Sequence, residues 1–254
     1  MIWFTSDLHL GHEAVIRMQN RPFQNAEEMN SVLIHNLNAC VKPEDKLYIL
    51  GDISHHITPE ESNALIRRIH GKKFLLLGNH DVTGDPEVCQ YDVKLFQWVG
   101  SYLKINAYHL NLIMMHYPML TWPKVMAGSV MLHGHIHSGP SYNEANRKAG
   151  IRRFDVGVDA NNYYPVSIEQ IKTWAERTPV MITPRTNLYI PGLWRQEPVS
   201  LAQYEAEHPD RKLVVYDAKG GNRECMNYHD DPELLKRPVL DAHAVSDGVW
   251  AVTV

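Results

Sequence analysis

The chain has few cysteines and no long apolar stretch. Its 254 residues include three cysteines, Cys40, Cys89 and Cys225, which form no CxxC pair and are odd in number. A disulfide framework is therefore not predicted. No window reaches 18 apolar residues, and the N-terminus has no basic segment followed by an apolar one. We accordingly expect no membrane span and no export signal, and a reducing, cytoplasmic location.

The sequence also lacks an excess of basic charge and any internal repeat. The formal net charge is −4 at pH 7, so extended duplex nucleic acid is not predicted as a partner. No period of 20–50 residues recurs and no low-complexity tract is present. The hydrophobic content of 44% is enough for an ordinary globular core. The oligomeric state stays open at this point.

Histidine, in contrast, is abundant, and the chain has 15 of them. The most informative stretch is Gly78-Asn79-His80-Asp81, which directly follows the apolar run of residues 74–77. Three polar side chains at the exit of a buried strand need partners, so the stretch indicates a site rather than packing. An asparagine oxygen can be a metal ligand, and an imidazole can carry a proton.

Strand and helix patterns alternate along most of the chain. We predict strands at residues 2–5, 46–50, 72–77, 110–115, 130–132 and 154–158, and helices at 26–41, 58–70 and 167–175. This alternation predicts an α/β fold with ligands at the carboxyl ends of the strands. Thr178-Pro179 and Thr183-Pro184 interrupt the pattern. We therefore expect a domain at 1–177 and a small α+β accessory region at 178–254, with a helix at 201–207 and strands at 213–216 and 249–254.

Polar side chains gather at the predicted strand ends, and they are Asp7, His9, Asp52, Asn79, His80, His116, His135 and His137. A set of imidazoles, carboxylates and one amide suits Mn, Fe, Zn, Co or Ni rather than Ca or metals that prefer thiolates. The ligands suffice for two ions. A carboxylate can bridge two such ions at a separation of ~3.5–4 Å.

These residues carry a resemblance to a known family. Asp7-Leu8-His9, Gly51-Asp52, Gly78-Asn79-His80-Asp81, His116 and Gly134-His135-Ile136-His137, in this order, resemble the five motifs of the calcineurin-like metallophosphoesterase superfamily over roughly residues 1–175. The run of residues 154–159 followed by Pro165-Val166-Ser167 is similar to the closing segment of its compact bacterial and phage members. The resemblance implies a four-layer α/β/β/α sandwich of two mixed sheets, with the accessory region appended.

The resemblance also implies roles for the site residues. Asp7, His9 and His137 would hold one divalent ion, and Asn79, His116 and His135 a second, with Mn favoured. Asp52 would bridge the two ions. A metal-held hydroxide would attack phosphorus in line, with Asn79 fixing the geometry. His80 would contact the phosphoryl oxygen or protonate the leaving group, and Asp81 would orient it.

Other polar groups are assigned less chemistry. We expect His12 and His133 to be supporting or packing groups, and His55-His56 to lie in a solvated loop, with substrate contact as the alternative. For the basic cluster Arg147, Lys148, Arg152 and Arg153, a solvated face is expected and phosphate contact is the alternative. His229-Asp230-Asp231 is expected to be a loop, because adjacent residues point apart and Pro232 follows.

The sequence therefore predicts a dinuclear metal-dependent phosphoesterase, with phosphodiesters of nucleotide type ahead of simple monoesters. A phosphomonoesterase or phosphoprotein phosphatase is the first alternative. Phosphoprotein members of the family carry arginines after Gly-Asp and Gly-Asn-His, where this chain has Ile53 and Asp81. A non-catalytic scaffold is the second alternative, and the complete ligand set counts against it. A nuclease for long DNA is disfavoured by the acidic balance.

Overall fold

The chain divides into two units, Met1–Leu188 and Tyr189–Val254. The structure, a computed structural model, describes residues 1–179, 200–210, 212–217, 223–224, 228–237, 239, 241–246 and 249–254. The expected division between residues 177 and 178 stays a prediction. None of the helices in these described residues is both long enough and apolar enough to cross a membrane.

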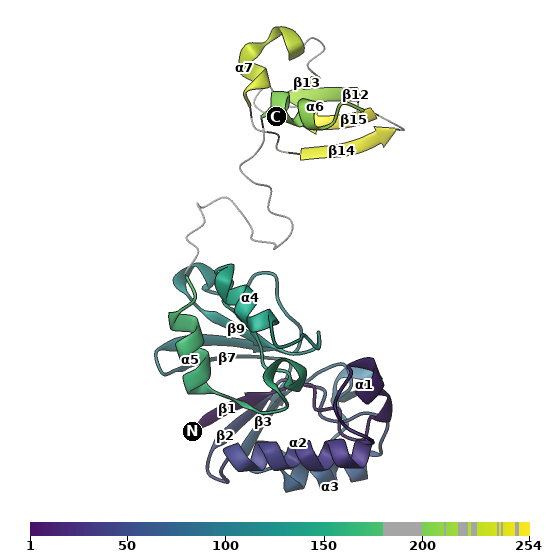
Figure 1. Cartoon of the computed structure of the whole chain (residues 1–254), viewed down its shortest axis with the longest axis vertical. Coiled ribbons are helices and arrows are strands. Elements are labelled where there is room, and N and C mark those ends of the chain that lie inside the picture. Colours follow the sequence, from purple (N-terminus) through teal and green to yellow (C-terminus); the bar gives the residue numbers. More distant parts are fainter. Residues whose placement is uncertain are drawn as a thin grey trace. The chain divides into compact units, whose positions relative to one another are not determined.

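Two mixed sheets form the frame of the first unit (Figure 1). In the larger sheet, β1 (Ile2–Thr5), β2 (Lys46–Ile49), β3 (Lys72–Leu76) and β6 (Trp98–Gly100) run parallel, and β11 (Val166–Ser167) pairs antiparallel with β1. In the smaller sheet, β10 (Arg153–Asp155), β9 (Val130–His133) and β8 (Leu110–Met115) run parallel, and β7 (Tyr102–Ala107) is antiparallel to β8. The parallel strands of each sheet therefore end at one edge.

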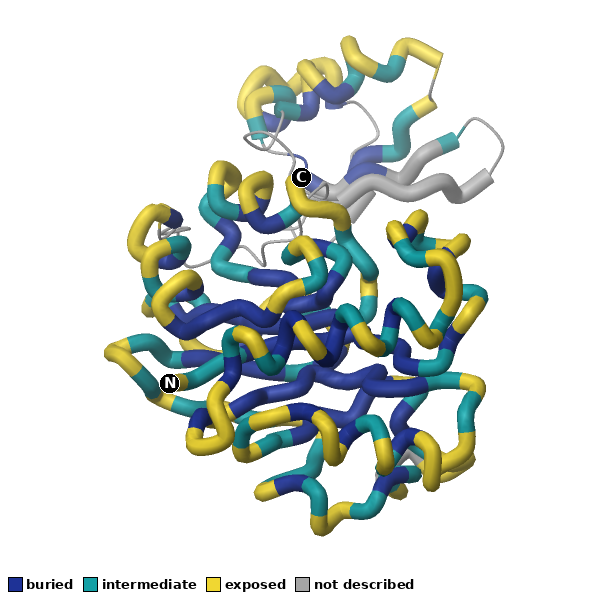
Figure 2. Tube along the Cα trace, turned by 60° about the horizontal axis from the view of Figure 1, so that its bottom comes forward, coloured by how far each residue is buried: buried dark blue, intermediate teal, exposed yellow. Residues whose placement is uncertain are grey.

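The central strands are buried on both faces because their apolar residues alternate between two cores. Leu47 and Ile49 of the β2 segment belong to the core that includes α2 (Ala26–Cys40) and α3 (Pro59–Arg68). Tyr48 and Leu50 belong to the core shared with the smaller sheet. Figure 2 shows a largely buried trace along the central strands, whereas the trace of the helices alternates between buried and exposed residues. Period-two burial on both faces is typical of a layered α/β sheet.

Helices α4 (Tyr142–Lys148) and α5 (Ile168–Glu176) complete the layers beside the smaller sheet. The Trp174 ring of α5 meets Phe154 of β10 edge-on at 5.0 Å between centroids, and its Nε1 donates to the carbonyl of Asn143 in α4 at 2.8 Å. The order of layers is α/β/β/α, and the predicted sandwich of two mixed sheets is confirmed.

Local signals set the helix ends. Thr58 and Glu61 form a reciprocal capping box at the start of α3, with Pro59 as the first helical residue. Ser167 and Gln170 do the same for α5. The predicted strand at 154–158 ends early, at Asp155, because the chain turns into a short 3-10 helix, η3 (Val158–Asn161). That turn carries Asp159 towards the site.

The remaining elements of the first unit are short. They are α1 (Glu13–Met18), β4 (Val82–Thr83), β5 (Asp85–Cys89), η1 (Val93–Leu95) and η2 (Val125–Ala127). The local sequence patterns did not predict α1, α4, β6 or β7. Their apolar periodicity is weak because each is short or half exposed.

The second unit is α+β. Its sheet has the order β13 (Arg223–Glu224), β12 (Lys212–Asp217), β15 (Val249–Thr253) and β14 (Asp241–Ser246), accompanied by α6 (Leu201–Glu207), η4 (Tyr228–Asp230) and α7 (Pro232–Leu235). Leu201, Tyr204 and Val215 lie in its own apolar core. His229 and Asp230, predicted to lie in a loop, belong to η4. The Asp231 carboxylate caps α7 by accepting from the amides of Glu233 and Leu234.

The core between the two sheets predicts a large effect of a single truncation. Leu76 is fully buried there, so Leu76→Ala is expected to lower the free energy of unfolding by about 2–5 kcal/mol through lost transfer energy and a cavity. Denaturant titration measures the change. The matched control is Leu120→Ala, because Leu120 is 53% exposed and the same substitution there should cost about 0.5 kcal/mol or less. Equal losses in the two variants would contradict the assigned core.

Candidate metal centre

All eight predicted site residues lie just beyond the carboxyl ends of parallel strands. Asp7 and His9 follow β1, Asp52 follows β2, and Asn79 and His80 follow β3, whereas His116 follows β8 and His135 and His137 follow β9. Backbone hydrogen bonds join the loops, from the amide of Asp7 to the carbonyl of Gly51 at 3.1 Å and from the amide of Gly134 to the carbonyl of His116 at 3.0 Å. The amide of His135 donates to both carboxylate oxygens of Asp7 at 3.0 Å, which connects the two sheets.

One group of possible ligands consists of Asp7, His9 and His137. One ligand atom from each lies within 4.8 Å of the other two. Nε2 of His9 and Nε2 of His137 are 3.2 Å apart, and Nε2 of His137 is 4.0 Å from Oδ1 of Asp7. This is the set that the sequence assigned to the first ion.

The other group consists of Asp52, His116 and His135, and it meets the same 4.8 Å limit. Nε2 of His116 is 3.4 Å from Oδ2 of Asp52 and 3.2 Å from Oδ1 of Asn79. Nδ1 of His116 lies 2.7 Å from the carbonyl oxygen of Leu50, which can only accept, so Nδ1 carries a proton and Nε2 faces the group. Asn79 thereby joins the set that the sequence assigned to the second ion.

Asp52 stands between the two groups. Its Oδ2 is 3.6 Å from Nε2 of His9 and 3.4 Å from Nε2 of His116. Its Oδ1 accepts the backbone amide of His80 at 2.9 Å, which fixes the carboxylate plane. A carboxylate held in this way can offer oxygen to an ion on either side.

The donor set fits divalent ions. His9 is buried, yet its Nδ1 has no hydrogen-bond partner among the described residues, and its Nε2 faces a carboxylate oxygen and a second imidazole nitrogen. Buried polar atoms are normally paired, so an arrangement of converging lone pairs needs a cation. Imidazole and carboxylate donors together suit ions of the borderline class.

Burial and charge shift the acid–base properties of the site in the absence of ions. Burial raises the pKa of Asp7 to about 7. Burial alone would lower the pKa of His116, but its hydrogen bond to Asp52 and the charges of Asp7 and Asp52 raise it to about 9. Burial lowers the pKa of His9 to about 2, which keeps this imidazole neutral and able to bind a metal.

A chain of hydrogen bonds behind His137 was not predicted. Nδ1 of His137 lies 2.7 Å from Oδ2 of Asp159, and the guanidinium of Arg21 donates to both oxygens of Asp159 at 2.8 Å. Arg21 also donates to the carbonyl of Asp7 at 2.8 Å. Such partners orient a ligating histidine and raise its basicity. The only sequence signal was the position of Asp159 at the end of the run 154–159.

The backbone of the site is strained. Asp7, His9, Asp52, His135 and His137 all have φ between 45° and 71°, in the left-handed region. Each such residue costs about 1–3 kcal/mol, and the conformation persists only because the surrounding structure imposes it. The glycines of the motifs allow close approach. A Cβ on Gly78 would collide with the Asp52 side chain, and one on Gly134 would collide with Ser6 and Asp7. The motif glycines therefore leave room for the ligands.

Asp81 has a different role from the expected one. It is fully buried, and its carboxylate accepts from the amides of Gly78, Asp52 and Ile53 at 2.7–2.9 Å and from the Tyr91 hydroxyl at 2.7 Å. These four bonds use both oxygens and fix the loops after β2 and β3 rather than the ring of His80. The prediction that Asp81 orients His80 is not supported by these contacts.

His80 is partly exposed and lies beside both ligand groups. It shares a 4.8 Å cluster with His9 and Asp52, and its ring centroid is 5.3 Å from that of His9. The ring of His55 lies against it at 4.0 Å. An imidazole in this position can reach a substrate that contacts both groups.

The other candidate residues, His133 and the basic cluster, make local contacts. His133 is fully buried with Nδ1 2.9 Å from the carbonyl oxygen of Gly134, as a packing group would be. Arg152 and Arg153 donate to backbone carbonyls of Gly128 and Met119, and Arg147 forms a bidentate pair with Glu144 at 2.7 Å. The basic cluster therefore stabilises local structure, whereas Lys148 is an exposed partner of Glu144.

Removing the charge behind His137 tests the role of that chain. Asp159→Asn keeps the shape but weakens the acceptor for His137, so the affinity for Mn²⁺ should fall about 10–100-fold. Calorimetric titration of the metal-free protein measures it, after circular dichroism has verified folding. Asp92→Asn is the matched control, because Asp92 is 38% exposed and pairs with Arg67 away from the site. An unchanged affinity in Asp159→Asn would show that the chain does not act on the metal.

Comparisons with known proteins agree with this geometry. The family model described as calcineurin-like phosphoesterase matches residues 1–243. An uncharacterized protein of Methanocaldococcus jannaschii is 32% identical over 72% of this chain and 95% of its own length. The gene 66 protein of Mycobacterium phage L5 is 29% identical over 62% of this chain and 86% of its own length.

A solved structure shares the fold as well. The chain resembles a protein of unknown function from Aquifex aeolicus with a TM-score of 0.54 and 26% identity, over 68% of this chain and 98% of that one. The family match covers nearly the whole sequence and includes all of the strand-end motifs. The chain therefore belongs to the calcineurin-like phosphoesterase family.

Proposed function

We propose that the protein is a dinuclear metal-dependent phosphodiesterase acting on nucleotide-type substrates. The observation that carries the proposal is the position of Asp52, whose Oδ2 lies within 3.6 Å of Nε2 of His9 and 3.4 Å of Nε2 of His116. Membership of a family that hydrolyses phosphate esters with divalent metals supports the chemistry. We assign Asp7, His9 and His137 to one ion, Asn79, His116 and His135 to the other, and Asp52 to both. Mn²⁺ is the ion we favour.

Each residue has a separate task in the proposed reaction. Two bound divalent ions would screen the charge of the phosphate and lower the pKa of an attacking water. Asp52 keeps the two ligand groups at a fixed separation. The Asn79 amide lies beside His116 of the second ligand group. From there it can position the phosphate for in-line attack. His80 donates a proton to the departing oxygen.

The environment of two residues argues against a phosphoprotein phosphatase. Ile53 is fully buried in the helix-side core, and Asp81 is fully buried in the hydrogen-bond network between two loops. Neither side chain can offer a guanidinium to a dianionic monoester, and both are buried away from solvent. This is consistent with the preference for diesters.

Turnover of two chromogenic substrates tests the proposal. With Mn²⁺, the wild type should hydrolyse bis-p-nitrophenyl phosphate faster than p-nitrophenyl phosphate. His80→Gln should lower kcat on the diester about 10²–10⁴-fold because the leaving group loses its acid. Asp52→Asn should lose activity together with bound metal. His70→Gln, which changes an exposed histidine, is the control and should retain full activity. A faster monoesterase reaction would favour the alternative, and no hydrolysis by a metal-loaded wild type would favour a scaffold.

The shifted pKa values predict how metal affinity depends on pH. Asp7, with a pKa of about 7, and His116, with a pKa of about 9, must both lose protons when ions bind. Affinity for Mn²⁺ should therefore rise with pH by about tenfold per unit for each proton released, and level off above about pH 9. Competition titrations between about pH 5 and pH 9 measure this. A constant affinity over that interval would contradict the assignment of these two groups as ligands.

A further inference from the structure

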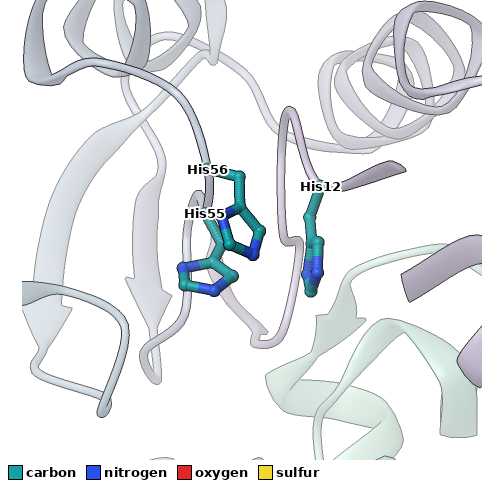
Figure 3. A group of neighbouring side chains, drawn as sticks. All are labelled: His12, His55 and His56. Atoms are coloured by element: carbon teal, nitrogen blue, oxygen red, sulfur yellow. The ribbon is translucent and has the colours of Figure 1, made fainter. Parts of the chain in front are cut away.

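Three histidines outside the predicted ligand set form a second cluster beside the centre. His12 comes from the loop after β1, and His55 and His56 come from the loop after β2. The two loops are joined by hydrogen bonds from the amide of Leu10 to the carbonyl of Ile53 at 2.9 Å and from the amide of His55 to the carbonyl of Leu10 at 3.1 Å. Figure 3 shows the ring of His12 opposite the rings of His55 and His56. The backbone thus fixes three imidazoles around one space.

The nitrogen atoms of this cluster are close enough to share an ion. One ring nitrogen from each histidine lies within 4.8 Å of the other two. The ring centroids are 4.7 Å apart for His12 and His55, 5.0 Å for His12 and His56, and 3.9 Å for His55 and His56. Nitrogens bound to one tetrahedral ion at ~2.0–2.1 Å are about 3.3 Å apart. Small side-chain rotations would therefore complete a site.

His12 supplies an independent observation. Only 8% of this residue is exposed, and its buried Nδ1 has no hydrogen-bond partner among the residues that the structure describes. Although His12 occupies the N-cap position of α1, its side chain makes no capping hydrogen bond. A buried unpaired ring nitrogen is unfavourable, and a bound cation would supply the partner that this position lacks.

The surroundings show what such an ion would do. The ring of His55 lies 4.0 Å from that of His80, and the ring of His12 lies 5.4 Å from that of His9. The cluster therefore adjoins the predicted centre on the side of His80. His55 is partly exposed and His56 is exposed, so an ion can enter from solvent.

We infer that His12, His55 and His56 bind a third divalent ion of the borderline class, such as Zn²⁺, Co²⁺ or Ni²⁺, separate from the two-ion centre. Three neutral imidazoles are a ligand set that these ions prefer. A tetrahedral ion with three protein ligands keeps one position for water or an anionic oxygen. This assignment goes beyond the expectations that His12 is a supporting group and that His55-His56 lie in a solvated loop or contact substrate.

Metal counting tests the inference. The full-length protein is loaded with Zn²⁺, passed through a desalting column in metal-free buffer, and its metal is measured by mass spectrometry. The wild type should keep about three ions per chain, and His56→Gln should keep about two. His56 is exposed, so this change should leave folding intact, which circular dichroism verifies. His35→Gln, an exposed histidine of α2, is the matched control and should keep about three.

The outcomes separate this inference from the proposed function. If the wild type and His56→Gln both keep about two ions, the third site is overturned while the two-ion centre stands. If the wild type keeps one ion that His56→Gln loses, the histidine cluster is supported and the two-ion centre is contradicted. A second readout uses the imidazole signals of His12 in nuclear magnetic resonance spectra. Zn²⁺ should shift them, and a shift produced by inorganic phosphate in the metal-free protein instead would overturn the inference in favour of an anion site.

Discussion

The geometry of the site depends on the hydrogen bonds of the buried Asp81 carboxylate. This carboxylate accepts hydrogen bonds from the amides of Gly78, Asp52 and Ile53 and from the Tyr91 hydroxyl, all within 2.9 Å and all buried. Hydrogen bonds to a buried charged group are strong, and an unpaired partner there would be costly. Asp81 therefore fixes the loop after β2 to the loop after β3, and Asp52 gains a defined position between the two ligand groups.

The strained backbone of the ligand loops follows from the same constraint. Five of the predicted ligands have positive φ, which asparagine, aspartate and histidine tolerate better than branched residues do. The strain is maintained by hydrogen bonds between the loops, such as those from the amide of His135 to the carboxylate of Asp7. A site built in this way is rigid before any ion binds, so little reorganisation is needed on binding.

The arrangement also explains why two sets of possible metal ligands lie at one edge of the fold. Each loop that follows a parallel strand places several polar residues at the same edge. Asp7 and Asp52, from the loops after β1 and β2, belong to the two groups of possible metal ligands. Residues further along the same two loops, His12, His55 and His56, gather beside these groups. Adjacent loops thus bring a second set of imidazoles next to the first.

The sequence by itself determined the alternating strands and helices, the strand-end motifs and the family. It could do so because apolar periodicity, helix caps and ordered motifs are local, and the capping box of Thr58 and the run before Gly78 are examples. Only the tertiary structure decided which polar groups meet. Arg21 and Asp159 are 138 positions apart, and Asp81 bonds to residues 28 and 29 positions away. Such pairings depend on the order of strands in the sheets and on the paths of the loops, which no local sequence pattern encodes. The tertiary structure was therefore needed to find the hydrogen-bond chain behind His137, the role of Asp81 and the cluster of His12, His55 and His56.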